Sequence, residues 1–275
     1  MKNILLPTDF SDNSWTAIVY ALKLYSDKDC TFYVLNSSEL KVTTTLNLSK
    51  KLVETLHKND KAQLLKFKER IESSYPNPNH EVKVLLSSEA LSEAIDTAIA
   101  THKIDMVVMG TKGATGLKAF VLGSNTVRII NKIIKCPILV IPENYNFIAP
   151  KQIAFPTDYS RFYAHKELRP IQDFADLWDS KIRVLYIAEK SSLTKEQKIN
   201  KAVLKEHFAH NKTGFHWVLK CLKITNEITS FVEDYKVDLL AMVKYKHSYF
   251  EKILREPIIK KIGFHITVPF LVIPK

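Results

Sequence analysis

Short apolar runs alternate with longer segments of helical periodicity along the chain. The runs are rich in Ile, Val, Leu and Phe and have the length of buried strands, as at 31–35, 104–109 and 138–141. The segments between them repeat apolar residues three and four positions apart, which indicates amphipathic helices, as at 13–25 and 52–74. Strands that alternate with helices predict an α/β fold, a parallel sheet with helices on both faces.

The same order of motifs occurs twice. The opening Asn-Ile-Leu-Leu-Pro-Thr-Asp-Phe-Ser at 3–11 returns as Gln-Ile-Ala-Phe-Pro-Thr-Asp-Tyr-Ser at 152–160. The closing apolar run at 136–142 returns at 268–274. This repeat predicts two tandem units, each a doubly wound five-stranded parallel sheet.

The unit boundaries follow from the spacing of these motifs. We expect the first unit at 1–146 and the second at 147–275, joined by a linker at 143–150 with prolines at both ends. The opening motifs are 149 residues apart and the closing ones 132, so the first copy is longer between its first and fourth strands. We expect the extra residues in the polar stretch at 37–51.

Polar residues ahead of the periodic segments predict where helices begin. Ser11 or Asp12 is expected to cap the first helix of the first copy, Ser88 the third and Ser124 the fourth. In the second copy a late helix is expected near 254–262.

Composition places the chain among globular proteins. It has 275 residues, 46% of them hydrophobic and 25% charged, and no apolar run approaches the ~18–20 residues of a membrane helix. We find no signal peptide. Three distant cysteines argue against disulfides and zinc, and a cytoplasmic protein without a metal site is expected.

The net charge of +11 is uneven. Residues 1–147 carry 18 basic and 15 acidic side chains, and residues 148–275 carry 22 and 14, which gives +3 and +8. No helix shows a basic stripe interleaved with aromatics, so a solvated lysine-rich surface is favoured over a nucleic-acid site.

Four of the six glycines lie in one short segment, at Gly110, Gly113, Gly116 and Gly123. The segment follows the fourth strand and leads into a helix, and we expect its glycines to allow positive φ and close approach of a ligand to backbone N–H groups. Free N–H groups and the helix dipole favour an anion there. The pattern predicts a phosphate site, although a glycine-rich turn without a ligand has the same appearance.

A ligand of an open parallel sheet lies beyond the strand ends where the strand order reverses. If the order is 3-2-1-4-5, that place lies between strands one and four. Asp9 could then accept hydrogen bonds from adenine or ribose, and Thr8 could donate one to a phosphate. Asp9 also fits a turn or cap residue, and the two roles are compatible.

Gly110-x2-Gly113-x9-Gly123-Ser124, with the Pro-Thr-Asp opening and the closing apolar run, resembles the universal stress protein family. The resemblance implies an adenine nucleotide alpha hydrolase-like fold of flavodoxin-like appearance, with the two units paired through their last strands. It also implies that the protein binds ATP, and whether Mg²⁺ accompanies the ATP is left open. A further homodimer is also left open. The implied nucleotide-binding residues are Pro7, Thr8, Asp9, Ser37, Met109, Gly110, Gly113, Gly123, Ser124 and Asn125.

The second copy keeps Pro-Thr-Asp but loses the glycines. Aligned through Asp238, Lys244 replaces Gly110, His247 replaces Gly113, and Pro257-Ile258 replaces Gly123-Ser124. Side chains would then stand where phosphate should touch backbone, so this unit is expected not to bind ATP and to act structurally, as the second half of a pseudo-dimer. A different anion at Lys244, Lys246 and His247 is a weaker hypothesis.

No nucleophile–base set, nucleophile elbow or Walker loop is visible. A nucleotide-binding regulatory module of the stress response is therefore favoured. Two alternatives stay open: a slow ATP hydrolase, and a nucleotide-independent scaffold that uses the basic second half for protein or nucleic-acid contacts.

Overall fold

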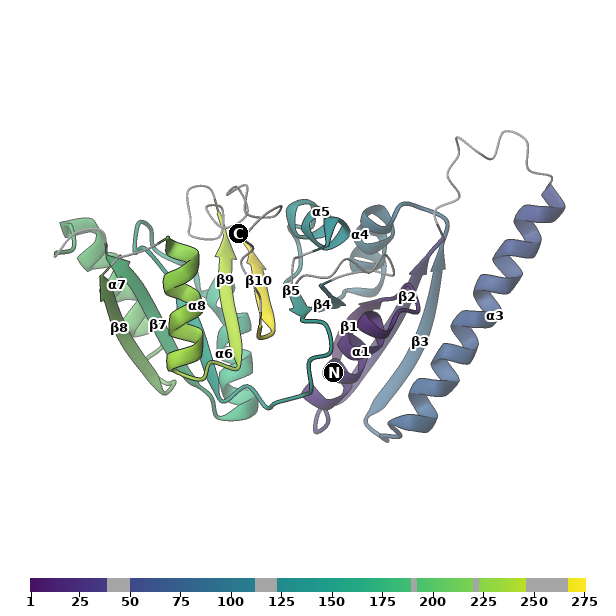
Figure 1. Ribbon diagram of the computed structural model, residues 1–275, viewed down its shortest axis with the longest axis horizontal. Coiled ribbons are helices and arrows are strands. Elements are labelled where there is room, and N and C mark those ends of the chain that lie inside the picture. Colours follow the sequence, from purple (N-terminus) through teal and green to yellow (C-terminus); the bar gives the residue numbers. More distant parts are fainter. Residues whose placement is uncertain (39–49, 112–122, 189–191, 220–222, 246–266) are drawn as a thin grey trace. The chain divides into compact units, whose positions relative to one another are not determined.

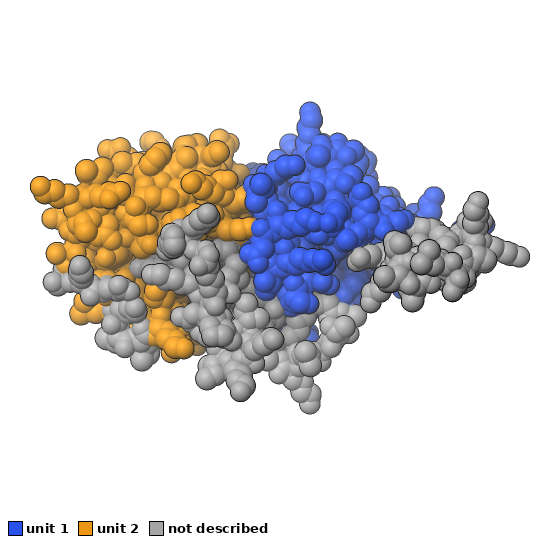
Figure 2. Space-filling model, turned by 90° about the horizontal axis from the view of Figure 1, so that it is seen from above, with its two compact units in different colours: residues 1–117, 123–147 blue, residues 118–122, 148–275 orange. Residues whose placement is uncertain are grey.

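The computed structural model describes residues 1–38, 50–111, 123–188, 192–219, 223–245 and 267–275, with residues 50–57 described by their backbone alone (Figure 1). The chain divides into two compact units, coloured separately in Figure 2, with the boundary after Phe147. No helix in the described ranges is both long and apolar enough to cross a membrane.

Unit 1 alternates strands and helices. Its strands are β1 (Lys2–Pro7), β2 (Cys30–Ser37), β3 (His80–Ser87), β4 (Met106–Gly110) and β5 (Ile138–Ile141). Its helices are α1 (Asp12–Leu24), α3 (Lys50–Ser74), α4 (Leu91–His102) and α5 (Ser124–Lys132). The strand order is β3-β2-β1-β4-β5, and every registered pair is parallel. This is the order 3-2-1-4-5 on which the expected position of the site depended.

Unit 2 repeats this arrangement. Its strands are β6 (Gln152–Pro156), β7 (Lys181–Ala188), β8 (Thr213–Leu219), β9 (Leu239–Lys244) and β10 (Phe270–Pro274). Its helices are α6 (His165–Trp178), α7 (Lys195–His207) and α8 (Ile224–Asp234). The order β10-β9-β6-β7-β8 is that of unit 1 read from its fifth strand. The predicted α/β fold with two parallel five-stranded halves is confirmed.

The central strands are buried on both faces. Ile4, Leu5 and Leu6 are consecutive residues of β1, and each is fully buried. Successive strand residues point to opposite faces, so both faces of the sheet are covered, as in doubly wound folds. The unbroken apolar runs of the sequence therefore mark the core.

Helix starts agree with the sequence only in part. Ser11 caps α1, because its side chain accepts the Ser14 N–H. The prediction for Ser88 is wrong: α4 begins at Leu91 and its cap position is Ala90, which has no side-chain acceptor. The helix expected near 254–262 lies outside the described residues.

The extra length of unit 1 lies between β2 and β3. The helix in this interval, α3, has 25 residues, whereas its counterpart α7 has 13. The prediction placed the additional residues in the polar stretch at 37–51, but a large part of them lengthens the helix. In Figure 1 the long helix runs beside β3.

Candidate functional site

A cavity of about 220 Å³ opens at the carboxyl ends of β1 and β4, the strands between which the order of unit 1 reverses. Ligands of open α/β sheets bind at such a reversal. Its walls come from the ends of β1, β2 and β4 and from α1, α4 and α5: Pro7, Thr8, Asp9, Ser14, Asn36, Ser37, Leu91, Ser92, Met109, Gly110, Asn125, Thr126, Arg128 and Ile129.

The turn after β1 is held by side-chain hydrogen bonds. The Phe10 N–H donates to Thr8 Oγ1 over 3.0 Å. The Ser11 N–H and hydroxyl donate to Asp9 Oδ1 over 3.2 and 2.5 Å. Phe10 has φ of 63°, a left-handed conformation that is strained for a bulky residue. The Thr8 and Asp9 bonds therefore stabilise a turn that the backbone alone disfavours.

The Thr8 hydroxyl is used inside the protein. The Ser14 hydroxyl donates its proton to Ser11 O over 2.8 Å, so in the 2.9 Å contact between Thr8 Oγ1 and Ser14 Oγ the donor is Thr8. Asn36 Nδ2 donates to the Thr8 carbonyl over 2.9 Å. Because the single Thr8 proton points to Ser14 in this arrangement, a hydrogen bond from Thr8 to a phosphate stays a prediction. Thr8 shapes the wall of the cavity.

Packing inside the protein requires a glycine at position 110. A Cβ on this residue would lie 2.5 Å from Asn13 Oδ1 and 2.7 Å from Asn13 Cγ. Asn13 is a buried residue of α1, so the close approach of α1 to the end of β4 requires glycine. The expectation of positive φ is wrong for Gly110 and for Gly123, whose φ is −58°. Gly113 and Gly116 lie outside the described residues.

Helix α5 begins beside the end of β4. The Gly123 N–H donates to Thr111 O over 2.5 Å, and Thr126 Oγ1 donates to Gly110 O and Thr111 O at 3.1 and 3.2 Å. These bonds fix Gly123 as the cap residue and Ser124 as the first helical residue. Ser124 is therefore not the helix cap that the sequence predicted.

The first turn of α5 presents amides at the cavity. The N–H groups of Ser124, Asn125 and Thr126 precede the first intrahelical bond, which runs from Val127 N–H to Gly123 O over 3.0 Å. Such amides and the positive end of the helix dipole together favour an anion.

Two cations follow on α5. Lys132 Nζ donates to Ser92 Oγ over 3.2 Å and forms an ion pair with Glu93 of α4. Hydrogen bonds from Lys132 and Ser92 lower the pKa of Glu93 to about 2. Arg128 lines the cavity one turn earlier, and no carboxylate in the described part of the chain forms an ion pair with it. Among the described residues of the wall, Arg128 is therefore the cation that an anion in the cavity would meet.

The structure brings together most of the predicted site residues. Seven of the ten line the cavity: Pro7, Thr8, Asp9, Ser37, Met109, Gly110 and Asn125. Gly123 and Ser124 begin α5, and Gly113 lies outside the described residues.

Sequence reasoning missed five polar residues of the wall: Ser14, Asn36, Ser92, Thr126 and Arg128. Asn36 precedes Ser37 at the end of β2, and Ser92 lies in the first turn of α4. Arg128 stands four residues after Ser124, so it belongs to the same helix face as the predicted phosphate residue. That spacing was the signal that could have identified Arg128.

Unit 2 builds the same turn after β6. The Tyr159 N–H donates to Thr157 Oγ1 over 3.1 Å, and the Ser160 N–H donates to Asp158 Oδ1 over 3.0 Å. Tyr159 has φ of 54°, as Phe10 does in unit 1. The Pro-Thr-Asp motif therefore forms this turn in both units, with and without the glycines.

In unit 2, the side chains of Tyr163, Tyr245 and Arg161 occupy the space at the ends of strands β6 and β9. The hydroxyl groups of Tyr163 and Thr157 lie 2.9 Å apart, and the Tyr245 hydroxyl donates to Asp158 Oδ1 over 2.9 Å. The Arg161 guanidinium lies 4.6 and 4.4 Å from the Tyr163 and Tyr245 ring centres. Tyr163 occupies the sequence position of Ser14 in unit 1, which lines the cavity there.

Strand register corrects one predicted equivalence. Leu5 of β1 pairs with Val107, and the corresponding Ala154 of β6 pairs with Leu240. Three residues further along each strand, Gly110 therefore corresponds to Val243, and the assignment to Lys244 was one residue too far. Val243 is buried, so a side chain still replaces the glycine hydrogen. Lys246, His247 and Pro257-Ile258 lie outside the described residues.

The fold and the cavity define a tandem α/β protein with a candidate ligand site where the strand order of its first unit reverses. The profile of the universal stress protein family matches residues 1–142, and the chain belongs to this family.

Known relatives agree with this assignment. A universal stress protein of Methanocaldococcus jannaschii is 30% identical over 142 residues, which cover 51% of this chain and 81% of the relative. A second one from that organism is 31% identical over 153 residues, which cover 51% and 94%. The crystal structure of a universal stress protein from Archaeoglobus fulgidus has a TM-score of 0.69 at 15% identity and covers 99% of this chain and 96% of its own. The last similarity extends the family fold over both units.

Proposed function

We propose that unit 1 binds ATP in the cavity at the ends of β1 and β4, and that the protein is a nucleotide-binding regulatory module of the stress response. The observation that carries the proposal is the meeting of three features at one cavity: the Asp9 turn, the first-turn amides of α5 and the Arg128 guanidinium. The glycine signature and family membership support it.

The cavity suits part of a nucleotide. Its volume of about 220 Å³ is below the range of roughly 300–1,000 Å³ for whole small-molecule sites. We assign the adenosine end to Asp9 and the end of β2, and the phosphates to the start of α5. The Ser37 hydroxyl donates to Glu89 O over 2.7 Å, so Ser37 would offer its backbone to the base.

A ligand explains the glycine at 123. Its φ of −58° and ψ of 152° are open to any residue, so backbone conformation does not require glycine there. A missing side chain lets a phosphate approach the N–H groups that follow. Gly123 is therefore the residue at which the proposal is best tested.

The described wall suits binding better than catalysis. Asp9 is its single carboxylate and already accepts two hydrogen bonds from Ser11. The Thr8 and Ser92 hydroxyls donate within the protein, to Ser14 and Glu93. Mg²⁺, where present, would be held mainly by the phosphates and water, since it prefers several oxygen ligands.

The test is isothermal titration of the full chain with ATP and, separately, with adenosine. Gly123→Val should raise the ATP Kd at least about tenfold, which corresponds to about 1.4 kcal/mol, because its branched side chain occupies the phosphate approach. Adenosine binding should change less.

Asn131→Val is the matched control, since Asn131 is exposed on the same helix and does not line the cavity. Both variants should melt close to wild type. Equal ATP affinity for wild type and Gly123→Val, or a wild-type protein that ignores millimolar ATP, would refute the proposal.

A further inference from the structure

The outer strand of unit 1 has one edge without a partner strand in the described chain. β3 is the first strand of the sheet order and pairs with β2 over its whole length, from Cys30↔His80 to Ser37↔Ser87. The N–H and C=O groups of its other edge can therefore accept a further strand.

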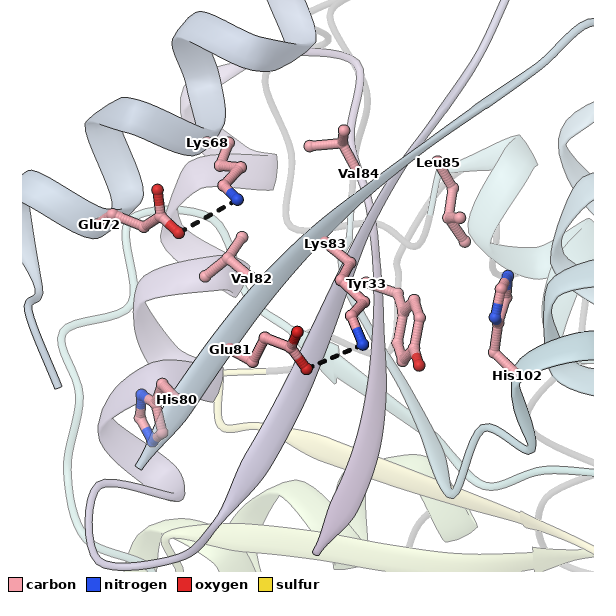
Figure 3. Close-up of a pocket in the computed structure, with 10 residues that line it drawn as sticks. All are labelled: Tyr33, Lys68, Glu72, His80, Glu81, Val82, Lys83, Val84, Leu85 and His102. Atoms are coloured by element: carbon pink, nitrogen blue, oxygen red, sulfur yellow. Dashed lines mark ion pairs between the residues drawn. The ribbon is translucent and has the colours of Figure 1, made fainter. Parts of the chain in front are cut away.

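A hollow of about 660 Å³ follows this edge (Figure 3). One side carries Val82 of β3 with Lys68 and Glu72 of α3, and the other carries Tyr33 and His102, whose rings stack at 4.7 Å. Figure 3 shows β3 passing between these two groups. The edge is thus open along a groove with a wall on each side.

Charged residues alternate with valines along the strand. Glu81 and Lys83 point to the Tyr33 side and form an ion pair of 2.8 Å, with 56% and 45% of their side chains exposed. Val82 lies between them on the α3 side. The strand therefore presents one acid and one base, two residues apart, on a single face.

We propose that this edge pairs antiparallel with β3 of a second copy of the chain, about a two-fold axis at Val82. In this register Glu81 stands opposite Lys83 of the other copy, and Lys83 opposite its Glu81. A shift of two residues would place Lys83 opposite Lys83 or Glu81 opposite Glu81, which is unfavourable. The charge pattern thus selects one self-complementary register.

Helix α3 repeats the complementarity. Lys68 and Glu72 form a 3.3 Å ion pair beside the groove, and Leu65, three residues before Lys68, is 42% exposed. The two-fold axis would run the α3 helices of both copies antiparallel on the same sheet face, which brings Lys68 of one copy toward Glu72 of the other.

The outer strand of unit 2 lacks such a pattern. β8 has no acidic residue and no lysine or arginine, and its neighbours Lys181 and Arg183 on β7 are both cations. Two such edges would bring like charges together. Charge complementarity therefore favours β3 as the self-pairing edge.

The test is sedimentation velocity of the full chain without nucleotide, at concentrations on the order of 100 µM, since an edge contact is small and weak. Wild type should sediment as a species of twice 31.6 kDa. E81K and K83E, each alone, should weaken association at least about tenfold, because each places like charges opposite each other.

Charge exchange makes the test specific. A mixture of E81K and K83E should form the mixed dimer, and the double variant E81K/K83E should dimerise again. The control D179K reverses one partner of the exposed Lys212–Asp179 pair in unit 2 and should leave association unchanged. Thermal melts check folding.

A monomeric wild type at this concentration overturns the proposal. A dimer that E81K and K83E leave intact overturns it as well, since association would then use another surface.

Discussion

At the scale of single residues, two glycines of the signature serve different purposes. Gly110 leaves room for Asn13, whose side-chain oxygen would lie 2.5 Å from an added Cβ. Gly123 has ordinary backbone angles, so its conformation does not require glycine, and its small size is assigned to the proposed ligand. A substitution at Gly110 therefore reports on packing, and one at Gly123 reports on the proposed ligand.

Gly110→Ala should lower the free energy of unfolding by about 1–3 kcal/mol, the usual cost of overpacking a buried site. Urea unfolding of the full chain measures it. In an Asn13→Ala background the cost should shrink, because the clashing atoms are gone. Gly123→Ala is the control and should be tolerated. A cost that stays undiminished in the Asn13→Ala background would contradict this account.

At the scale of elements, the start of the helix after the first strand separates the two units. α1 begins at Asp12, whereas α6 begins at His165, four residues later in the repeat. Residues 161–164 are therefore not helical. Tyr163 and Arg161 reach the ends of β6 and β9, whose counterparts β1 and β4 form the cavity in unit 1. Glu167 holds this segment, because Arg161 donates two hydrogen bonds and Ala164 N–H donates one to its carboxylate.

This contact predicts a pH dependence of stability. Burial raises the pKa of Glu167, but hydrogen bonds from Arg161 and Ala164 and the Arg161 charge outweigh burial and set the pKa below 4.5. Its stabilisation is therefore present above about pH 4.5 and is lost as the pH falls through the lower folded-state pKa. Glu167→Gln should cost about 1–2 kcal/mol at pH 7 and progressively less below pH 4.5.

Urea unfolding at pH 7, 5 and 3 measures this difference. Asp173→Asn, in the exposed Arg169–Asp173 pair, should stay within a few tenths of a kcal/mol of wild type at every pH. A Glu167→Gln deficit that is constant with pH would show that the carboxylate charge is not responsible.

At the scale of the whole molecule, one fold occurs twice with one candidate nucleotide site. Both units share strand order and the strained turn at Phe10 and Tyr159. They differ at Gly110, which corresponds to buried Val243, and at Ser14, which corresponds to Tyr163. The pairing of the two units through their last strands stays a prediction.

We expect one ATP per chain. Equilibrium dialysis or calorimetry of the full chain should give a stoichiometry near one, because Tyr163, Arg161 and Tyr245 fill the corresponding strand ends of unit 2. Gly123→Val should weaken this one site and leave no site of wild-type affinity. Two sites in wild type, or a site of unchanged affinity in this variant, would contradict a non-binding second unit.

Much of the fold was predictable because it depends on local periodicity and on the repeat. Apolar strand runs and the Ser11 cap follow from short stretches of sequence, whereas the strand order was an assumption that the structure agrees with. The errors lie where local cues were ambiguous: Ser88 precedes α4 without capping it, and Ser124 follows the residue that does cap α5. The assignment of Lys244 counted one residue too far, because Gly110 lies five residues after Asp105 and the fifth residue after Asp238 is Val243, as strand pairing shows.

The amino-acid order was enough to define the doubled α/β architecture and the glycine signature from which a phosphate site is predicted. Only the folded chain shows the contact between Gly110 and Asn13 and the direction of the Thr8 hydroxyl hydrogen bond. The same holds for the filled strand ends of unit 2 and for the edge of β3 that lacks a partner strand in the described chain. Each depends on groups that are distant in sequence, or on the direction of one hydrogen bond. Periodicity carries no information about either, because it reports which face of an element is buried and not which atom lies opposite.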